Sequence, residues 1–248
     1  MALSKDGDDF RKSIGKLFDT GLYSDAQVVV GTTIFNVHKS VLCTQNAYFA
    51  HAFDVAHGFK ESYTSVITIE EPANVEVIKA MLEYIYKGDY TVASDTEAQL
   101  VVDTGVYAAA EMFRVEGLKQ LAAERISSNI DKVFSSSNLA IVLDNVYEYT
   151  PEHDRQVRDL FAKAATTKIE REGLLGSATF REAIKENGNF AADIVLAMHK
   201  TVNIQAEVTC RICTSTTLVP TKAVEEERAI LCDGCNRVYG FQYWNIKE

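Results

Sequence analysis

Four of the chain's five cysteines lie near its C-terminal end, in two closely spaced pairs. They stand in the segments Cys210-Arg211-Ile212-Cys213 and Cys232-Asp233-Gly234-Cys235, which are separated by 18 residues. A C-x-x-C turn points two sulfurs toward one position, and two such turns complete the tetrahedral thiolate cage that suits zinc. The spacing therefore predicts one Zn²⁺ ion bound by Cys210, Cys213, Cys232 and Cys235. Because thiolate fills all four positions, none is left for water, and we expect a structural zinc rather than a hydrolytic one.

Two other kinds of chemistry are compatible with paired cysteines. Thiol oxidoreductases use a single pair at a helix N-terminus after a strand, with an exposed thiolate, and the presence of two pairs argues against this alternative. A zinc ribbon could also bind nucleic acid by stacking bases on the aromatic residues between Tyr239 and Trp244. The acidic run at 225–227 and Asp233 weaken any phosphate contact, so we expect these rings to pack the ribbon or to contact protein.

The residues around the cysteines form short runs with strand composition, at 216–219, 229–231 and 238–244. Gly234 and Asn236 favour the turn at the second pair. A segment of about forty residues cannot build a sufficient core from its own side chains, and bound metal can replace that core. We therefore expect a small zinc ribbon over residues 204–248.

The N-terminal part mixes helical and strand patterns. Apolar residues recur at helical spacing over 9–20 and again over 75–87, where Gly88 follows as a helix end. The runs 27–30 and 33–37 flank Gly31-Thr32 as a hairpin, and a β-branched run covers 66–69. Between the hairpin and this third strand, Val41, Leu42, Phe49 and Phe53 indicate a helix. The expected core comprises Val37, Val41, Leu42, Phe49, Phe53, Ile67, Ile69, Ile78, Leu82 and Ile85.

From Thr96 to about Lys200 the strand signal disappears and apolar residues recur at helical intervals. Short breaks at Ser135–Asn138, at Pro151, at Gly173 and Gly176, and at Gly188 divide this stretch into several helices. The chain between Thr96 and about Lys200 is therefore predicted to be all helix.

Composition limits the classes of partner. The chain has 35 acidic and 25 basic residues and a formal net charge of −10, which opposes attraction to nucleic acid or to anionic lipid. No apolar run is long enough for a signal sequence or a membrane span, so we expect a soluble protein of the cytoplasm or nucleus, without a membrane role. In such a reducing compartment the cysteine pairs are metal ligands rather than disulfides.

Residues 17–90 resemble the BTB/POZ domain, a mixed α/β interaction module. The matching text includes Phe35-Asn36-Val37-His38-Lys39-Ser40-Val41-Leu42, Phe59-Lys60-Glu61-Ser62 and Met81-Leu82-Glu83-Tyr84-Ile85-Tyr86-Lys87-Gly88. The stretch from Val106 to Asp193 is similar to the helical, BACK-like half of a group of fungal BTB proteins. The resemblance implies an α+β fold in which a small sheet covered by helices forms a BTB/POZ domain at 9–93. A helical region at 94–203 and the zinc ribbon at 204–248 would follow.

The resemblance also implies two interaction sites. Phe59-Lys60-Glu61 matches the family's hydrophobic-any-Glu tripeptide, through which many such domains hold a cullin scaffold of a ubiquitin ligase. Alternatively, this segment is a plain turn between helix and strand in which Phe59 caps the core. Asp25 and Lys39 match the two positions whose opposite charges line the family's pocket at the dimer interface, although they could equally be an ordinary surface pair.

No pattern of an enzyme is found. The five histidines are scattered, and the chain has no glycine-rich phosphate loop and no evident acid/base pair. We therefore expect a protein that binds other proteins and catalyses no reaction. The first hypothesis is an adaptor that docks on a cullin-type scaffold and recruits a target. The alternative is a homodimeric scaffold or transcription-linked regulator with no ligase role.

Overall fold

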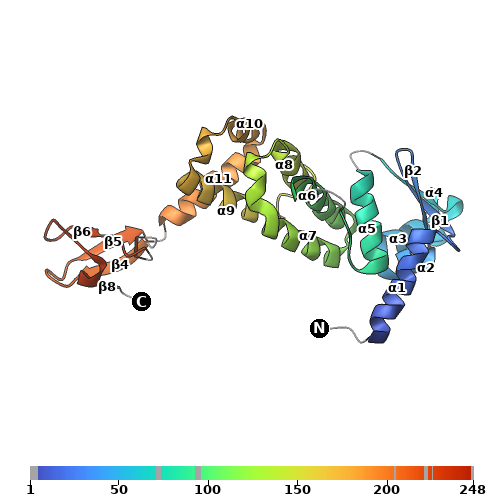
Figure 1. Cartoon of the computed structure of the whole chain (residues 1–248), viewed down its shortest axis with the longest axis horizontal. Helices are drawn as coiled ribbons and strands as arrows, with labels where there is room; N and C mark the ends of the chain where they lie inside the picture. The colour runs from blue at the N-terminus through green and yellow to red at the C-terminus, as the bar shows by residue number, and fades with distance from the viewer. Residues whose placement is uncertain are drawn as a thin grey trace. The chain divides into compact units, whose positions relative to one another are not determined.

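A computed structural model describes residues 5–70, 74–92, 96–203, 205–220, 223–224 and 226–246 of the chain. The chain forms two compact units, Met1–Phe190 and Ala191–Glu248. Figure 1 shows their elements in chain order, from α1 in blue to the C-terminal strands in red. No helix among the described residues is both long enough and apolar enough to cross a lipid bilayer.

The N-terminal half of the first unit is a three-stranded sheet covered by helices. Its elements are α1 (Lys5–Thr20), β1 (Ala26–Val30), β2 (Thr33–Val37), α2 (Lys39–Gln45), α3 (Ala47–Phe53), η1 (Val55–His57), α4 (Lys60–Thr64), β3 (Val66–Ile69) and α5 (Val75–Lys87). The strand order is β2-β1-β3. The predicted hairpin is confirmed, since β1 pairs antiparallel with β2 across Gly31, whose φ is 57°. β3 pairs with β1 in parallel, so α2, α3 and α4 form the crossover between the two strands.

The core of this half is built from alternate strand residues and from one face of each helix. Val28, Val37 and Ile67 point into it from the sheet, and Leu42, Phe49, Ile78 and Leu82 come from α2, α3 and α5. Nine of the ten expected core residues are buried; Val41 is only partly buried, because it lies in a groove beside α1.

The helical pattern over Val41–Phe53 proves to be two helices. Asn46 separates them with an extended backbone (φ −147°, ψ 125°) and caps α3 by accepting a hydrogen bond from the Phe49 backbone N–H at 3.2 Å. Its side-chain amide also donates to the Phe113 carbonyl at 2.8 Å. Asn46 thus ends one helix, begins the next and ties both to a later part of the chain.

The stretch after Thr96 consists of helices joined by short turns, and its described residues up to Asn203 include no strand, as predicted. It contains α6 (Thr96–Phe113), α7 (Glu116–Asn129), η2 (Ile130–Ser135), α8 (Leu139–Tyr147), α9 (Arg155–Glu172), η3 (Leu174–Gly176), α10 (Ala178–Glu186) and α11 (Gly188–Asn203). Within the first unit, the rings of Phe134, Phe161, Phe180 and Phe190 meet edge to face in its core.

The sheet-containing half and the helices share one packed junction. The buried Tyr90 hydroxyl, just after α5, donates to the Asp103 carboxylate of α6 at 2.6 Å, and the Arg125 guanidinium of α7 lies 3.9 Å from the Tyr90 ring centroid. Gly105 of α6 packs so closely on Val77 of α5 that a side chain there would collide with it. Since α5 and α6 are in close contact at Val77 and Gly105, the helices after residue 96 continue the core of the sheet-containing half.

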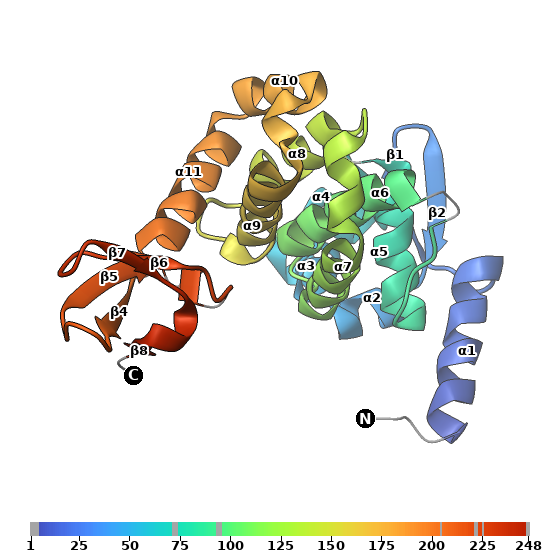
Figure 2. The same ribbon diagram turned by 60° about the vertical axis from the view of Figure 1, so that its left-hand side comes forward.

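The second unit contains most of α11 and a small β module. Its strands are β4 (Gln205–Cys210), β5 (Thr216–Pro220), β6 (Ile230–Cys232), β7 (Arg237–Tyr239) and β8 (Trp244–Ile246), with η4 (Phe241–Tyr243) before β8. They form one sheet of order β5-β4-β8 and a separate β6–β7 hairpin, which Figure 2 shows at the C-terminal end. The strand run expected at 238–244 is interrupted by Gly240 and the turn η4, so its two ends belong to different sheets.

Candidate metal centre and docking surface

The four paired cysteines come together in the β module. The sulfur atoms of Cys210, Cys213, Cys232 and Cys235 all lie within 4.8 Å of one another. Cys210 ends β4 and Cys232 ends β6, so each of the two sheets contributes one turn. Tetrahedral metal sites with four cysteines need this arrangement, and the group can hold a metal ion. Among the described residues, no other set of three or more histidine, cysteine or acidic side chains converges in this way.

The two cysteine turns have the same backbone shape. The residue after each second cysteine, Thr214 or Asn236, adopts a left-handed conformation, with φ of 60° and 50°. The Thr214 N–H donates to the Cys210 carbonyl at 2.9 Å, and the Asn236 N–H donates to the Cys232 carbonyl at 2.8 Å. Asparagine tolerates this conformation better than most residues, which agrees with the turn that the sequence predicts at Asn236.

The sulfur atoms of Cys213 and Cys232 are only 3.4 Å apart, so either thiol can donate a hydrogen bond to the other sulfur. Hydrogen bonds from the Ser215 hydroxyl and the Ser215 backbone N–H lower the pKa of Cys213 to about 6. The backbone N–H of Cys235 acts in the same direction on Cys232, but burial and the neighbouring sulfurs outweigh it and raise the pKa of Cys232 to about 12. Crowding the sulfurs thus makes a fully deprotonated set unfavourable unless a cation balances the charge.

The predicted tripeptide lies on the surface of the sheet-containing half. Phe59 occupies the N-cap position of α4, its side chain is 50% exposed, and its ring stacks on His57 at 6.2 Å. Lys60 is exposed, and Glu61 is partly buried in the first turn of α4. Phe59 is therefore not a core residue, in contrast to the alternative in which it caps the core.

Other exposed apolar side chains come from the short helices on either side of Phe59 in the chain. Tyr63 of α4 is 69% exposed, and Val55 of η1 and Tyr48 of α3 are also exposed. Burial raises the pKa of Tyr48 and the charge of Glu61 raises it further, so Tyr48 lies within electrostatic range of the tripeptide. We call Tyr48, Val55, Phe59, Glu61 and Tyr63 the docking patch. The sequence reasoning missed Tyr48, Val55 and Tyr63 as surface residues, because their apolar type alone does not tell exposure from burial.

Two histidines that are scattered in the sequence meet beside the docking patch. The rings of His51 and His57 lie 5.0 Å apart, and His57 Nδ1 is 3.2 Å from the Asp54 carboxylate. The side chains of His57 and Asp54 are both close to half exposed, so solvent screens this pair and it contributes little to stability.

Asp25 and Lys39 are neighbours, but they do not pair through their charged ends. The Asp25 carboxylate accepts a hydrogen bond from the Lys39 backbone N–H at 2.8 Å, at the start of α2. The Lys39 ammonium donates to the Ser65 hydroxyl at 2.7 Å and lies 5.1 Å from the Phe53 ring centroid. In this single chain Asp25 therefore caps α2, and a role at a dimer interface stays a prediction.

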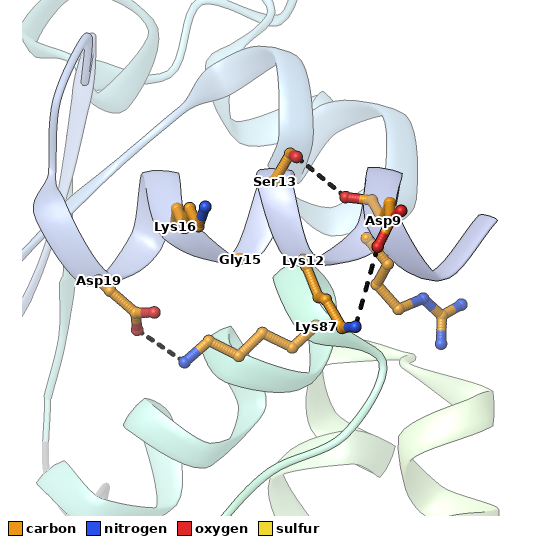
Figure 3. A pocket seen from close by; sticks show the side chains of 8 residues that line it. Asp9, Lys12, Ser13, Gly15, Lys16, Asp19 and Lys87 are labelled. Carbon is orange, nitrogen blue, oxygen red and sulfur yellow. Dashed lines mark hydrogen bonds and ion pairs between the residues drawn. The ribbon is translucent and has the colours of Figure 1, made fainter. Parts of the chain in front are cut away.

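An open hollow of about 830 Å³ runs along α1 and the end of α5 (Figure 3). The absent side chain of Gly15 leaves room for the Lys87 side chain, whose ammonium pairs with Asp19 at 2.6 Å. Lys12 faces Asp9 in the same hollow at 3.9 Å. Because carboxylates stand among the cations, the hollow concentrates no single charge, and the Asp19–Lys87 contact fixes α1 against α5.

Comparisons with known proteins agree with this fold. A family model described as the BTB/POZ domain matches residues 14–130. TD and POZ domain-containing protein 2 of Mus musculus is 29% identical over 132 residues, which are 53% of this chain and 34% of that protein. TD and POZ domain-containing protein 1 of Mus musculus is 26% identical over 137 residues, again 34% of its length. The chain thus spans about a third of the length of these relatives.

Two solved BTB domains align with half of the chain. The BTB domain of zebrafish PATZ1 is 19% identical, covers 52% of this chain and 97% of its own, and gives a TM-score of 0.40. The BTB domain of human Gigaxonin is 23% identical, covers 50% of this chain and 95% of its own, and gives a TM-score of 0.36.

The family match covers the β2-β1-β3 sheet, the helices around it and the first helices beyond it. It starts within α1, includes the docking patch and the junction of α5 with α6, and ends after α7. Residues 14–130 therefore form a BTB/POZ domain, a protein–protein interaction module with a mixed α+β fold.

Proposed function

We propose that this protein is an adaptor that docks on a cullin-type scaffold of a ubiquitin ligase and recruits a target through its C-terminal parts. One observation carries the proposal: Phe59 is half exposed at the surface of the BTB/POZ domain, directly beside Glu61. A half-exposed aromatic ring of this kind can anchor a partner.

The docking patch has the composition of an interface centre. Phe59, Tyr63 and Tyr48 supply rigid aromatic surface, and Glu61 supplies one partly buried charge that a basic partner residue can meet. Aromatic residues carry a large share of binding energy at interfaces, while charges mainly set specificity and orientation. The patch therefore suits a helical partner surface that combines apolar side chains with a lysine or arginine.

We further propose that the four-cysteine site holds one structural Zn²⁺ ion. The donor set of four thiolates, the shared turn geometry and the burial of Cys210 and Cys232 all fit tetrahedral zinc. Zinc would supply cohesion to the β module, and the four residues would leave no position for a reacting water.

Binding of the purified chain to the N-terminal domain of a cullin tests the adaptor function. Replacing a hot-spot residue costs about 2 kcal/mol or more, so Phe59→Ala and Glu61→Ala should each weaken binding by about 30-fold. Ile141→Ala in α8 is the matched control for Phe59, with an equally exposed apolar side chain, and Glu124→Ala in α7 is the control for Glu61. Both controls should bind like the parent. Binding that is absent, or that survives both patch substitutions, would refute the proposal.

A second candidate function is a homodimeric scaffold without a ligase role. The observation that favours it is a groove of about 380 Å³ between α1, α2 and α5, lined by Ile14, Val41 and Ile85 and flanked by the exposed ring of Phe10. Sedimentation equilibrium of the parent and of Phe10→Asp tests this function. Dimers of the parent that dissociate in the variant would support it, and a parent that stays monomeric at high concentration would exclude it.

A further inference from the structure

The four sulfurs of the metal centre differ in their access to solvent. Cys210 and Cys232 are completely buried, and they belong to the hydrophobic core of the β module with Val208, Val219, Ile230 and Trp244. Cys213 and Cys235, the second cysteine of each pair, are only partly buried. A competing ligand from solvent therefore reaches the site on the side of Cys213 and Cys235.

Tyr239 lies against one of these two accessible sulfurs. Its hydroxyl oxygen is 3.4 Å from the Cys235 sulfur, and once that thiol is deprotonated the hydroxyl is the only possible donor of the two. The Tyr239 ring contacts the rings of Tyr243 and Trp244, and the Trp244 indole N–H reaches the Tyr239 carbonyl at 3.5 Å. The Tyr239 ring is thus packed against two other rings, and its backbone carbonyl is held by a hydrogen bond.

Ser215 occupies the equivalent position at the other accessible sulfur. A side chain at Gly234 would meet both the Ser215 hydroxyl and the Cys213 sulfur, so these two atoms border the same small space, and the Ser215 hydroxyl and backbone N–H act on that sulfur as hydrogen-bond donors. The Ser215 hydroxyl fills the space that a side chain at Gly234 would need, so the second cysteine turn is built around it. Each accessible sulfur therefore has one protein hydroxyl beside it, supplied by a residue outside the C-x-x-C pairs.

We propose that Tyr239 and Ser215 are positioning residues of the metal centre, which hold Cys235 and Cys213 and slow the loss of the metal from its accessible side. The inference rests on the proposed Zn²⁺ site. A hydrogen bond to a metal-bound thiolate draws charge from the sulfur, and the sulfur is then a poorer target for protons and for competing ligands. It also fixes the rotamer of a side chain that solvent could otherwise pull away.

The test uses the full chain loaded with Zn²⁺ or with Co²⁺, whose visible spectrum reports the sulfur ligands. Tyr239→Phe and Ser215→Ala each remove one hydroxyl and little else. Loss of an outer hydrogen bond to a metal ligand typically lowers affinity by 10–100-fold, so we expect each variant to release Zn²⁺ to a coloured chelator about 10-fold faster. The sulfur-to-cobalt absorption bands should shift as well.

Matched controls separate this effect from a general destabilisation of the β module. Tyr243→Phe removes a tyrosine hydroxyl from a ring that contacts Tyr239, and Thr216→Ala removes an exposed hydroxyl next to Ser215. Both controls should release Zn²⁺ at the parental rate.

The outcomes separate the two proposals. If Tyr239→Phe and Ser215→Ala bind one metal ion and release it at the parental rate, the positioning role is refuted and the zinc site stands. If the freshly purified parent and the reconstituted parent bind no metal at all, the zinc site fails and the positioning role fails with it.

Discussion

Removing the metal should unfold the β module and leave the helical unit folded. Among its described residues, the buried side chains of the module are Val208, Val219, Ile230 and Trp244 and the two cysteines Cys210 and Cys232. A bound metal would therefore occupy a place that a larger domain fills with side chains. A chelator in excess, applied to the full chain, is the perturbation.

The magnitude follows from the size of that core. Each buried aliphatic or aromatic side chain contributes about 1.5–3 kcal/mol, and the described part of the module has four such side chains besides the cysteines. Zinc in small structural sites contributes about 10–16 kcal/mol, which equals or exceeds the whole stability of a typical domain, about 5–15 kcal/mol. Loss of the ion should therefore unfold the module completely rather than loosen it.

The chain has a built-in reporter for this experiment. Trp244 is the chain's single tryptophan and is 3% exposed in the core of the β module, so selectively excited tryptophan emission reports that module alone. Far-UV circular dichroism is dominated by α1–α11 and reports the helices. After chelation we expect the emission to shift to the red while the helical signal and its melting temperature stay unchanged.

Two substitutions sharpen the comparison. Cys232→Ser should give the emission of the chelated chain without any chelator, because it removes a completely buried ligand. Cys43→Ser alters the one cysteine outside the cluster, on α2, and should behave like the parent. The reasoning is refuted if metal analysis shows loss of the ion while Trp244 emission stays in place, or if the helical signal falls together with it.

Three further outcomes are expected. Gly234→Ala should destabilise the metal-loaded β module by about 1–3 kcal/mol in denaturant titrations followed by Trp244, because the added methyl group collides with Ser215; an unchanged midpoint would contradict this. Asp154→Asn keeps the cap of α9 but removes the carboxylate that pairs with Lys119 at 2.9 Å, and urea unfolding should show a loss of about 3 kcal/mol. Asp159 forms an exposed ion pair with Arg155, so Asp159→Asn should cost less than about 1 kcal/mol of stability. Equal losses for Asp154→Asn and Asp159→Asn would contradict the argument. Burial alone would raise the pKa of Asp154, but hydrogen bonds from Lys119 and Tyr107 outweigh it and lower the pKa below its ordinary value. This stabilisation is therefore fully present above about pH 4 and is lost as the pH falls through the lowered pKa, and Asp154→Asn should flatten that part of the stability profile.

Local patterns were sufficient to predict most of the fold. The strands at 27–30, 33–37 and 66–69 and the helix at 75–87 follow from β-branched runs, a glycine turn and helical spacing, which act within a few residues. The break at Asn46 was missed because helical spacing continues across it. At the break, Asn46 caps α3 and donates a hydrogen bond to the Phe113 carbonyl, 67 residues further along the chain, and periodicity contains no information about such a contact.

The candidate sites were also predicted only in part: local spacing gave some of their residues, and contacts formed on folding decide the others. The spacing of the two C-x-x-C pairs alone predicted that the four cysteine sulfurs converge, since each pair forms a short turn and a four-cysteine metal site needs two of them. Ser215 and Tyr239 were missed as neighbours of sulfur, because their hydroxyls reach Cys213 and Cys235 only after the turns and the β6–β7 hairpin have formed. The extent of the docking patch was missed because the exposure of Tyr63 and Val55 depends on which helix faces the core covers.

The junction between the sheet-containing half and the later helices decides where the polypeptide can be divided. A fragment that ends near residue 93 would lose the carbonyl partner of Asn46, the acceptor of the Tyr90 hydroxyl and the ring that stacks on Phe49. Gene truncations at that point should yield insoluble material. In evolution, recombination can move the sheet-containing half to a new protein only together with α6 and α7, which complete its core.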